Sequence, residues 1–248
     1  MESSPTGAAR SWWADLIAAI LVGVIVALFV RTWVVQVFEI PTESMEPTLL
    51  RGDHVLVNRF VFGTGAADAP SWLPMRAVRR GDIVVFRFPP DPTRNYVKRA
   101  VALGGDVLEI TDKELRVNQE PMDESAYVVH DDPRIYPRSL FLHDGYRKRD
   151  NFGPVVVPQG YLFMLGDNRD DSYDSRFWGQ VPRRLLKGRP LVVLWSMTPG
   201  SPPGAAGAGK GEAPVVPTGV DRAPSAGSGE AASVLDRIRW RRTLRPVR

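Results

Sequence analysis

The chain has 248 residues, 44% of them hydrophobic, with a formal net charge of +4 and no cysteine. This length and composition are sufficient to bury one good hydrophobic core. The lack of cysteine excludes disulfides, thiolate catalysis and cysteine-rich zinc sites. We therefore expect a single folded domain, to which an anchoring segment is joined.

An apolar segment near the N-terminus predicts a membrane anchor. Its uninterrupted part, Leu16 to Val30, has 15 residues, fewer than the ~18 of a clear spanning helix. Trp13 and Trp33 lie 20 residues apart, which in a helix is about 30 Å, the separation of the two aromatic belts of a bilayer. We predict a transmembrane anchor over residues 13–37, after a short N-terminus of residues 1–12.

A cleaved signal peptide is the alternative interpretation of this segment. Arg10 is the only basic residue before the apolar run, and no A-x-A-like site follows the run. Both observations favour a permanent anchor. Arg31 follows the run, where its long side chain can reach the headgroups. With one arginine on each side, charge alone does not determine the orientation.

The segment from Pro41 to Pro47 carries a lone serine between two prolines. Prolines lack a backbone donor and restrict φ, so the segment is predicted to be an exposed, extended turn at the membrane edge. A structural serine needs no such setting. We therefore expect Ser44 to be the reactive side chain of this turn.

From Phe38 onward, short apolar runs alternate with Gly, Pro, Asp and Asn, which is typical of an antiparallel β domain. We predict a mainly β fold over residues 38–197, including a hairpin centred on Asn118. Residues 122–152 have no clear period and are predicted to be a loop or small cap. The predicted strands include residues 54–57, 82–88, 96–101, 106–110, 114–117, 161–165 and 190–195.

The strand from Tyr96 to Val101 contains two basic residues in an apolar run. Side chains alternate along a strand, so one of Lys98 and Arg99 is expected to point toward the core. Burial disfavours an ammonium ion and lowers its pKa, so a buried lysine can accept a proton from a serine hydroxyl near neutral pH. Ser44 and Lys98 together would supply a nucleophile and a general base.

A dense polar segment, Gly166 to Gly179, follows the apolar strand Tyr161 to Leu165, and loops next to rigid strands often carry function. Together with the serine and lysine segments, it resembles the bacterial type I signal peptidases, membrane-anchored serine proteases. Five ordered boxes carry the resemblance between about Ile40 and Pro182. They are residues 41–53, 80–86, 96–106, 153–158 and 166–178.

The resemblance implies a role for each matching side chain. Ser44 resembles the nucleophile and Lys98 the general base, which later protonates the leaving amine. The backbone N–H of Ser44 is expected to form part of an oxyanion hole, with the hydroxyl of Thr42 as second donor. Many relatives carry serine at the position of Thr42, and the small residue often found next to it is Glu43 here.

Three residues of the polar segment resemble supporting groups of the same family. The resemblance implies that Ser172 hydrogen-bonds the lysine amine and orients it. It also implies that Asp174 and Arg176 form an ion pair behind the site. No metal or organic cofactor is implied, and three histidines without metal-ligand spacing are expected to be structural or on the surface.

The implied activity is removal of signal peptides from exported preproteins. The resemblance implies a single-pass protein of the bacterial inner (cytoplasmic) membrane, with residues 1–12 cytoplasmic and residues 38–197 extracytoplasmic. Its expected partners are signal-peptide-bearing preproteins, the lipid bilayer and the protein export machinery. The expected partners do not include nucleic acid.

Two alternatives remain open from the residues. One is a specialised relative with the same dyad, such as a pilin-maturing peptidase or a self-cleaving repressor. A repressor needs a DNA-binding module, for which an N-terminal anchor leaves no obvious room. The other is a membrane-tethered β domain that binds extended peptides without cutting them, although such a module has no need of Ser44, Lys98 and Ser172 together.

The C-terminal region differs in composition from the rest of the chain. Residues 198–232 are rich in Gly, Pro, Ala and Ser and are predicted to be a flexible linker. Residues 233–248 form a basic tail, and without residues 236–248 the net charge would be −1 instead of +4. The tail is expected to lie on lipid headgroups or on its own β domain, or to be a solvated end.

Overall fold

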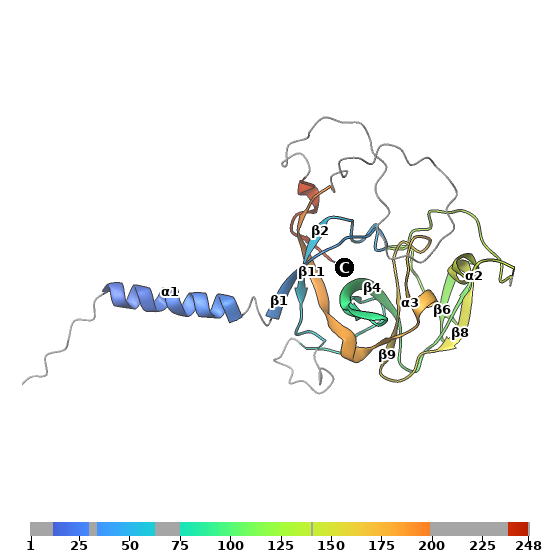
Figure 1. Cartoon of the computed structure of the whole chain (residues 1–248), viewed down its shortest axis with the longest axis horizontal. Helices are drawn as coiled ribbons and strands as arrows, with labels where there is room; N and C mark the ends of the chain where they lie inside the picture. The colour runs from blue at the N-terminus through green and yellow to red at the C-terminus, as the bar shows by residue number, and fades with distance from the viewer. Residues whose placement is uncertain (1–11, 30–33, 63–74, 140, 199–237, 248) are drawn as a thin grey trace, which may run out of the picture.

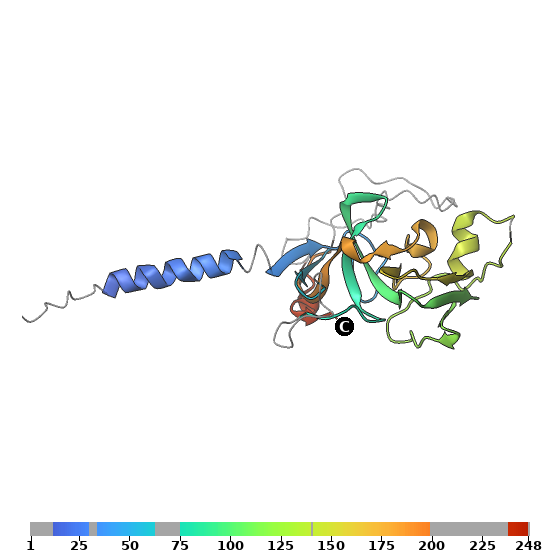
Figure 2. The same cartoon turned by 90° about the horizontal axis from the view of Figure 1, so that it is seen from below.

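The computed structural model describes residues 12–29, 34–62, 75–139, 141–198 and 238–247. Its first element is the helix α1, Trp12–Phe29, which is 18 residues long and has no buried residue. At 1.5 Å per residue the helix is about 27 Å long, and it is apolar enough to cross a membrane. It extends away from the β strands in Figures 1 and 2.

The end of the predicted anchor is corrected by the structure. Residues 35–37 of the expected 13–37 segment belong to strand β1, Val35–Glu39, which pairs with β2, Asp53–Asn58. A backbone that exchanges hydrogen bonds with a neighbouring strand cannot continue the helix, so the folded domain begins earlier than predicted. Trp33, the second tryptophan of the anchor argument, lies outside the described residues, as do residues 1–11.

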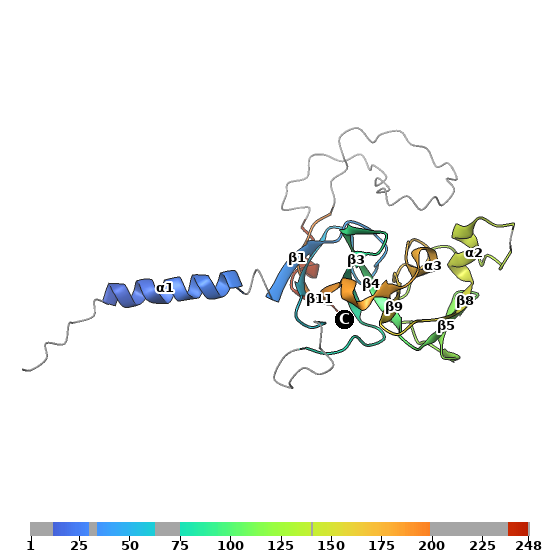
Figure 3. The ribbon, with the colours of Figure 1, turned by 60° about the horizontal axis from the view of Figure 1, so that its bottom comes forward.

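The β strands form two antiparallel sheets among the described residues, as the spacing of apolar runs predicts (Figure 3). The larger has the order β1-β2-β11-β3-β4-β9-β10, with β12 also on β11, and the smaller has the order β7-β6-β5-β8. The remaining bounds are β3 Ile83–Phe88, β4 Asp91–Leu103, β5 Val107–Thr111, β6 Glu114–Val117, β7 Glu120–Pro121, β8 Phe152–Val156, β9 Tyr161–Leu165, β10 Val181–Pro182, β11 Leu186–Ser196 and β12 Arg245–Pro246.

Short helices connect these strands. The bounds are α2 Asp144–Asp150, α3 Ser175–Trp178, and the 3₁₀ helices η2 Arg183–Leu185 and η3 Trp240–Arg242. The segment predicted to be a loop or small cap therefore contains α2 and the start of β8. The predicted hairpin is confirmed, because β6 and β7 pair around Asn118 and Gln119, which both have positive φ.

The two sheets share a hydrophobic core. Leu108 and Leu115 of the smaller sheet pack with Val101, Phe163 and Leu165 of the larger one. A second cluster packs the residues after β1 against β2, and includes Ile40, Met45 and Leu49. The second cluster fixes the base of the turn that carries Ser44, because two of its buried side chains, Met45 and Leu49, belong to that turn.

The C-terminal tail packs on the β domain in its described part, residues 238–247. β12 pairs with β11, and Val247 joins the core cluster of Met45 and Leu49. Of the open interpretations of the tail, the one that packs it on its own domain is therefore confirmed for these residues. The predicted linker, apart from Thr198, and residues 233–237 lie outside the described residues.

Candidate active site

The serine turn, residues 41–53, connects β1 to β2. Its backbone is held by hydrogen bonds from the Leu49 amide to the Met45 carbonyl, 2.9 Å, and from the Ile40 amide to the Asp53 carbonyl, 2.8 Å. Met45 and Leu49 are buried beneath it. The turn is therefore a rigid platform, and Ser44, 7% exposed, lies on the side that faces β4.

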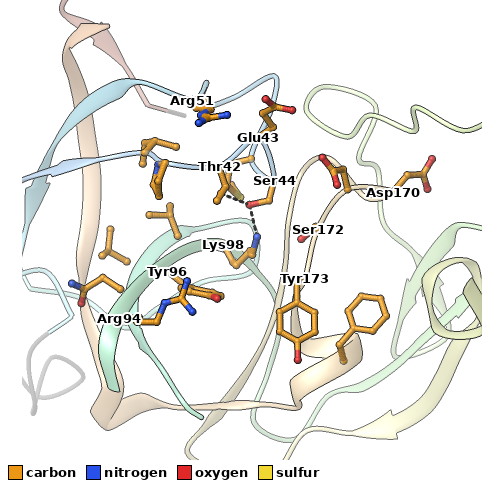
Figure 4. A pocket seen from close by; sticks show the side chains of 18 of the residues that line it. Thr42, Glu43, Ser44, Arg51, Arg94, Tyr96, Lys98, Asp170, Ser172 and Tyr173 are labelled. Carbon is orange, nitrogen blue, oxygen red and sulfur yellow. Dashed lines mark hydrogen bonds between the residues drawn. The ribbon is translucent and has the colours of Figure 1, made fainter. Parts of the chain in front are cut away.

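Lys98 reaches the turn from β4. Its Nζ is 2.5 Å from Ser44 Oγ, although 54 residues separate the two in the chain (Figure 4). Burial lowers the pKa of Lys98 to about 8, against the attraction of the Asp174 carboxylate. A neutral amine at this distance accepts the hydroxyl proton, which is what a serine nucleophile requires.

The alternation argument for β4 is only half correct. It predicts that one of Lys98 and Arg99 faces the core, whereas the structure buries both, at 3% and 4% exposure. Arg99 points to the opposite face of the strand, where it forms a buried ion pair with Asp167 at 2.7 Å and stacks on Tyr127. Both faces of β4 are covered here, so alternation does not separate a buried residue from an exposed one.

Thr42 lies beside Ser44. Its Oγ1 is 3.2 Å from Ser44 Oγ. The side chain is exposed at the edge of the pocket, so its hydroxyl is free to turn toward an oxygen bound next to Ser44. The role of this hydroxyl as an oxyanion donor stays a prediction.

Ser172 lies in the wall of the same pocket and is 6% exposed. Its hydroxyl makes no hydrogen bond of good geometry in the described part of the chain, although it lies close enough to Asp174 to help lower the pKa of that carboxyl, so the expected bond to the Lys98 amine is not formed in this structure. The orienting role of Ser172 stays a prediction, and a buried hydroxyl without a well-formed hydrogen bond is free to turn toward an incoming group.

Asp174 and Arg176 form the buried ion pair that the resemblance implies, at 2.8 Å. Burial alone would raise the pKa of Asp174, but the charge and hydrogen bonds of Arg176 outweigh it, and the pKa is lowered. Arg176 also donates to the carbonyls of Arg149 and Arg169 at 2.7 Å each. The pair joins α3 to α2 and to the polar segment, and Asp174 holds a negative charge within electrostatic reach of Lys98.

Sequence reasoning did not identify a second attachment of the serine turn. Asp167 accepts from Thr48 Oγ1 at 2.6 Å, and the Asn168 amide donates to the Ser44 carbonyl at 3.2 Å. A Cβ on Gly166 would lie only 2.4 Å from that carbonyl and 2.2 Å from Ser172 Oγ. The residues that make this attachment belong to the polar segment that the sequence analysis singled out. Their contact with the serine turn could not be predicted, because it depends on the pairing of β4 with β9.

A pocket of about 720 Å³ surrounds these groups. It is lined by β1, the serine turn, the first half of β4, helix α2 and residues 170–173 (Figure 4). A nucleophile, a buried amine and a neighbouring hydroxyl donor are the parts needed for acyl transfer. The site therefore has the groups that a serine hydrolase needs.

Comparison with known proteins agrees with this class. The family model described as "Signal peptidase, peptidase S26" matches residues 13–195. The signal peptidase I of Aquifex aeolicus (strain VF5) is 31% identical over 217 residues, covering 70% of this chain and 80% of the relative. The signal peptidase I of Pseudomonas fluorescens is 36% identical over 194 residues, covering 69% and 68%. The chain belongs to the signal peptidase family, peptidase S26.

Among solved structures, a signal peptidase I from Enterococcus faecalis V583 is similar to part of the chain. The two are 25% identical, with a TM-score of 0.35, over 46% of this chain and 97% of the other.

The lowered pKa of Lys98 predicts the pH dependence of the reaction. Only the neutral amine accepts a proton, so kcat/KM is expected to rise with pH and to level off above about 8. Peptide cleavage in detergent between about pH 6 and pH 10 measures this profile. A profile that is flat or falls with pH over this range would contradict the assignment, and Lys98→Arg, whose side chain stays charged, serves as an inactive control.

Substitution of Thr42 tests the oxyanion donor. Thr42→Val keeps the branched shape but removes the hydroxyl, and the expected fall in kcat is about 10²-fold or more, with KM little changed. Thr42→Ser keeps the donor and is the matched control. Equal kcat values for Thr42→Val and the wild type would rule out a side-chain donor at this position.

Gly166→Ala tests the close approach between the polar segment and the serine turn. The added methyl would push on the Ser44 carbonyl and on Ser172, and a displacement on the order of 1 Å at the nucleophile costs about 10²-fold in rate. Steady-state kinetics on correctly folded protein measure the loss. Gly23→Ala in α1, where a Cβ meets nothing within 4 Å, is the control and should leave kcat unchanged.

Proposed function

We propose that this protein is a membrane-anchored serine endopeptidase that removes N-terminal signal peptides from exported preproteins. The observation that carries the proposal is the 2.5 Å contact between Ser44 Oγ and the buried Lys98 amine, in a chain of the signal peptidase family. The relatives named above are signal peptidase I proteins, and this chain spans more than two thirds of their length.

The reaction begins when the region to be cleaved enters the pocket as an extended segment, in the manner of an added β strand. Lys98 takes the proton of the Ser44 hydroxyl as Oγ attacks the scissile carbonyl. The carbonyl oxygen becomes an oxyanion, which accepts hydrogen bonds from the Ser44 backbone N–H and the Thr42 hydroxyl. Collapse of this intermediate breaks the C–N bond.

Lys98 then returns its proton to the departing amine, which is the new N-terminus of the mature protein. The signal peptide stays bound to Ser44 Oγ as an ester. A water molecule gives a proton to Lys98 and attacks this ester, and the proton passes back to Ser44 as the acid leaves. In this scheme the Ser172 hydroxyl orients the amine, and the Asp174–Arg176 pair holds the surrounding loop.

The anchor gives the reaction its location. In the proposal, α1 spans the bacterial inner (cytoplasmic) membrane once, with residues 1–12 in the cytoplasm and the β domain outside. α1 ends at Phe29 and β1 begins at Val35, so the two are at most about 22 Å apart along the chain. The active site therefore stays near the bilayer in which the signal helix is embedded, which favours encounter with the substrate. The bilayer and the export machinery are the proposed partners.

Cleavage of a model preprotein with an A-x-A site, in detergent or liposomes, tests the function. Wild-type protein is expected to cut after the small residue, and Ser44→Ala to reduce the rate to background, as judged by the product mass. Ser125→Ala is the matched control, because Ser125 is exposed and does not line the pocket. A folded wild type that binds the preprotein without cutting it would support the alternative of a peptide-binding domain.

A further inference from the structure

The C-terminal strap, residues 238–247, lies against the base of the serine turn. Met197 and Ile238 form a bridge, β12 pairs with β11, and Val247 packs in the same core cluster as Met45 and Leu49. In Figure 1 the strap, in red, lies beside β2 and β11. The strap thus packs against β11 and against the core cluster beneath the serine turn.

Arg242 of the strap binds the turn at several points. Its Nη2 donates to Asp53 Oδ2 at 2.6 Å and to the Thr48 carbonyl at 3.0 Å, and its Nε donates to Asp53 Oδ1 at 3.2 Å. Asp53 is fully buried, and its Oδ2 also accepts from the Leu50 amide at 2.9 Å. A buried carboxylate with these partners fixes the backbone around it, and removing its cation is costly.

Arg239 fastens the end of the turn to β11. Its Nη2 donates to the Arg51 carbonyl, and to the Met197 carbonyl at 3.0 Å, while its Nε donates to Ser196 Oγ at 2.8 Å. Gly52 has φ +84°, and a Cβ there would lie 2.0 Å from the Met197 carbonyl oxygen. The backbone of the serine turn at Gly52 therefore lies directly against the backbone at Met197, just after β11, and the strap binds both.

We infer that Arg242 is a positioning residue for the cleavage reaction, acting through Asp53 and Thr48 on the orientation of Ser44. The inference rests on the proposed function only in taking Ser44 as the nucleophile. Thr48 follows Ser44 by four residues. The hydrogen bond from the Leu49 amide to the Met45 carbonyl closes the turn of chain between them, so a shift of Thr48 is passed on to Ser44. Lys98 is held separately by β4, so a shift of the turn changes the distance from Ser44 Oγ to the amine.

The experiment compares Arg242→Met with Arg241→Met in the full-length chain. Both remove one positive charge from the same 3₁₀ helix, but Arg241 is exposed and no hydrogen bond from it is formed in the described part of the chain. Arg242→Met is expected to lower kcat about 10- to 100-fold with KM changed less than about threefold. Arg242→Lys, which keeps the charge, is expected to retain an intermediate kcat.

Two further readouts separate positioning from general destabilisation. The midpoint of the pH profile should stay at about 8 in Arg242→Met, because the burial that lowers the pKa of Lys98 is not altered. Hydrogen exchange should accelerate at the amides of Leu49, Gly52 and Asp53, which are hydrogen-bonded in the turn, and not in the pair β5–β6. The exchange experiment needs no substrate, so it also judges the inference if the wild type does not cut preproteins.

Two results would overturn the inference. One is an Arg242→Met protein with the kcat and the exchange rates of Arg241→Met. The other is an Arg242→Met protein with a lowered melting temperature but unchanged kcat at temperatures where it is folded, because Arg242 would then serve stability alone. Wild-type protein that leaves the model preprotein intact would refute the proposed function, while faster exchange in the turn of Arg242→Met would still support the inference.

Discussion

The lysine amine that is buried against a serine hydroxyl is the constraint on which the rest of the site depends. In water an ammonium ion holds its proton to high pH, and a serine hydroxyl gives its own up with difficulty. Burial of Lys98 lowers its pKa to about 8, and the 2.5 Å contact directs the neutral amine at Ser44 Oγ. Such an amine is useful only while the contact holds, because the catalytic geometry tolerates little displacement.

Two sets of contacts in the surrounding structure hold the serine turn in place. In one, the buried Arg99–Asp167 pair and the close approach of Gly166 join β4 and the polar segment to the serine turn. In the other, Arg242 and Asp53 join the turn to the C-terminal strap. Buried ion pairs add little net stability, but breaking one leaves an uncompensated charge, so such pairs favour a single arrangement of the elements they connect.

The structure also relates the anchor to the site. β1 follows α1 after a short connection and leads directly into the serine turn, so the apolar helix and Ser44 lie close together in the sequence. A substrate whose signal helix is still in the bilayer meets the pocket with little loss of freedom. In this proposal the anchor contributes proximity as well as attachment.

The sequence by itself determined the class of the fold and predicted the pair of side chains that we propose to be reactive. The spacing of apolar runs predicted the strands, Asn118 predicted its hairpin because asparagine tolerates positive φ, and the ordered boxes indicated Ser44 and Lys98. Only the tertiary structure decided where β1 begins, that Arg99 is buried together with Lys98, and that Arg242 binds Asp53 across 189 residues. These features depend on which strands become neighbours, and strand order is set by long-range packing that no local sequence pattern records.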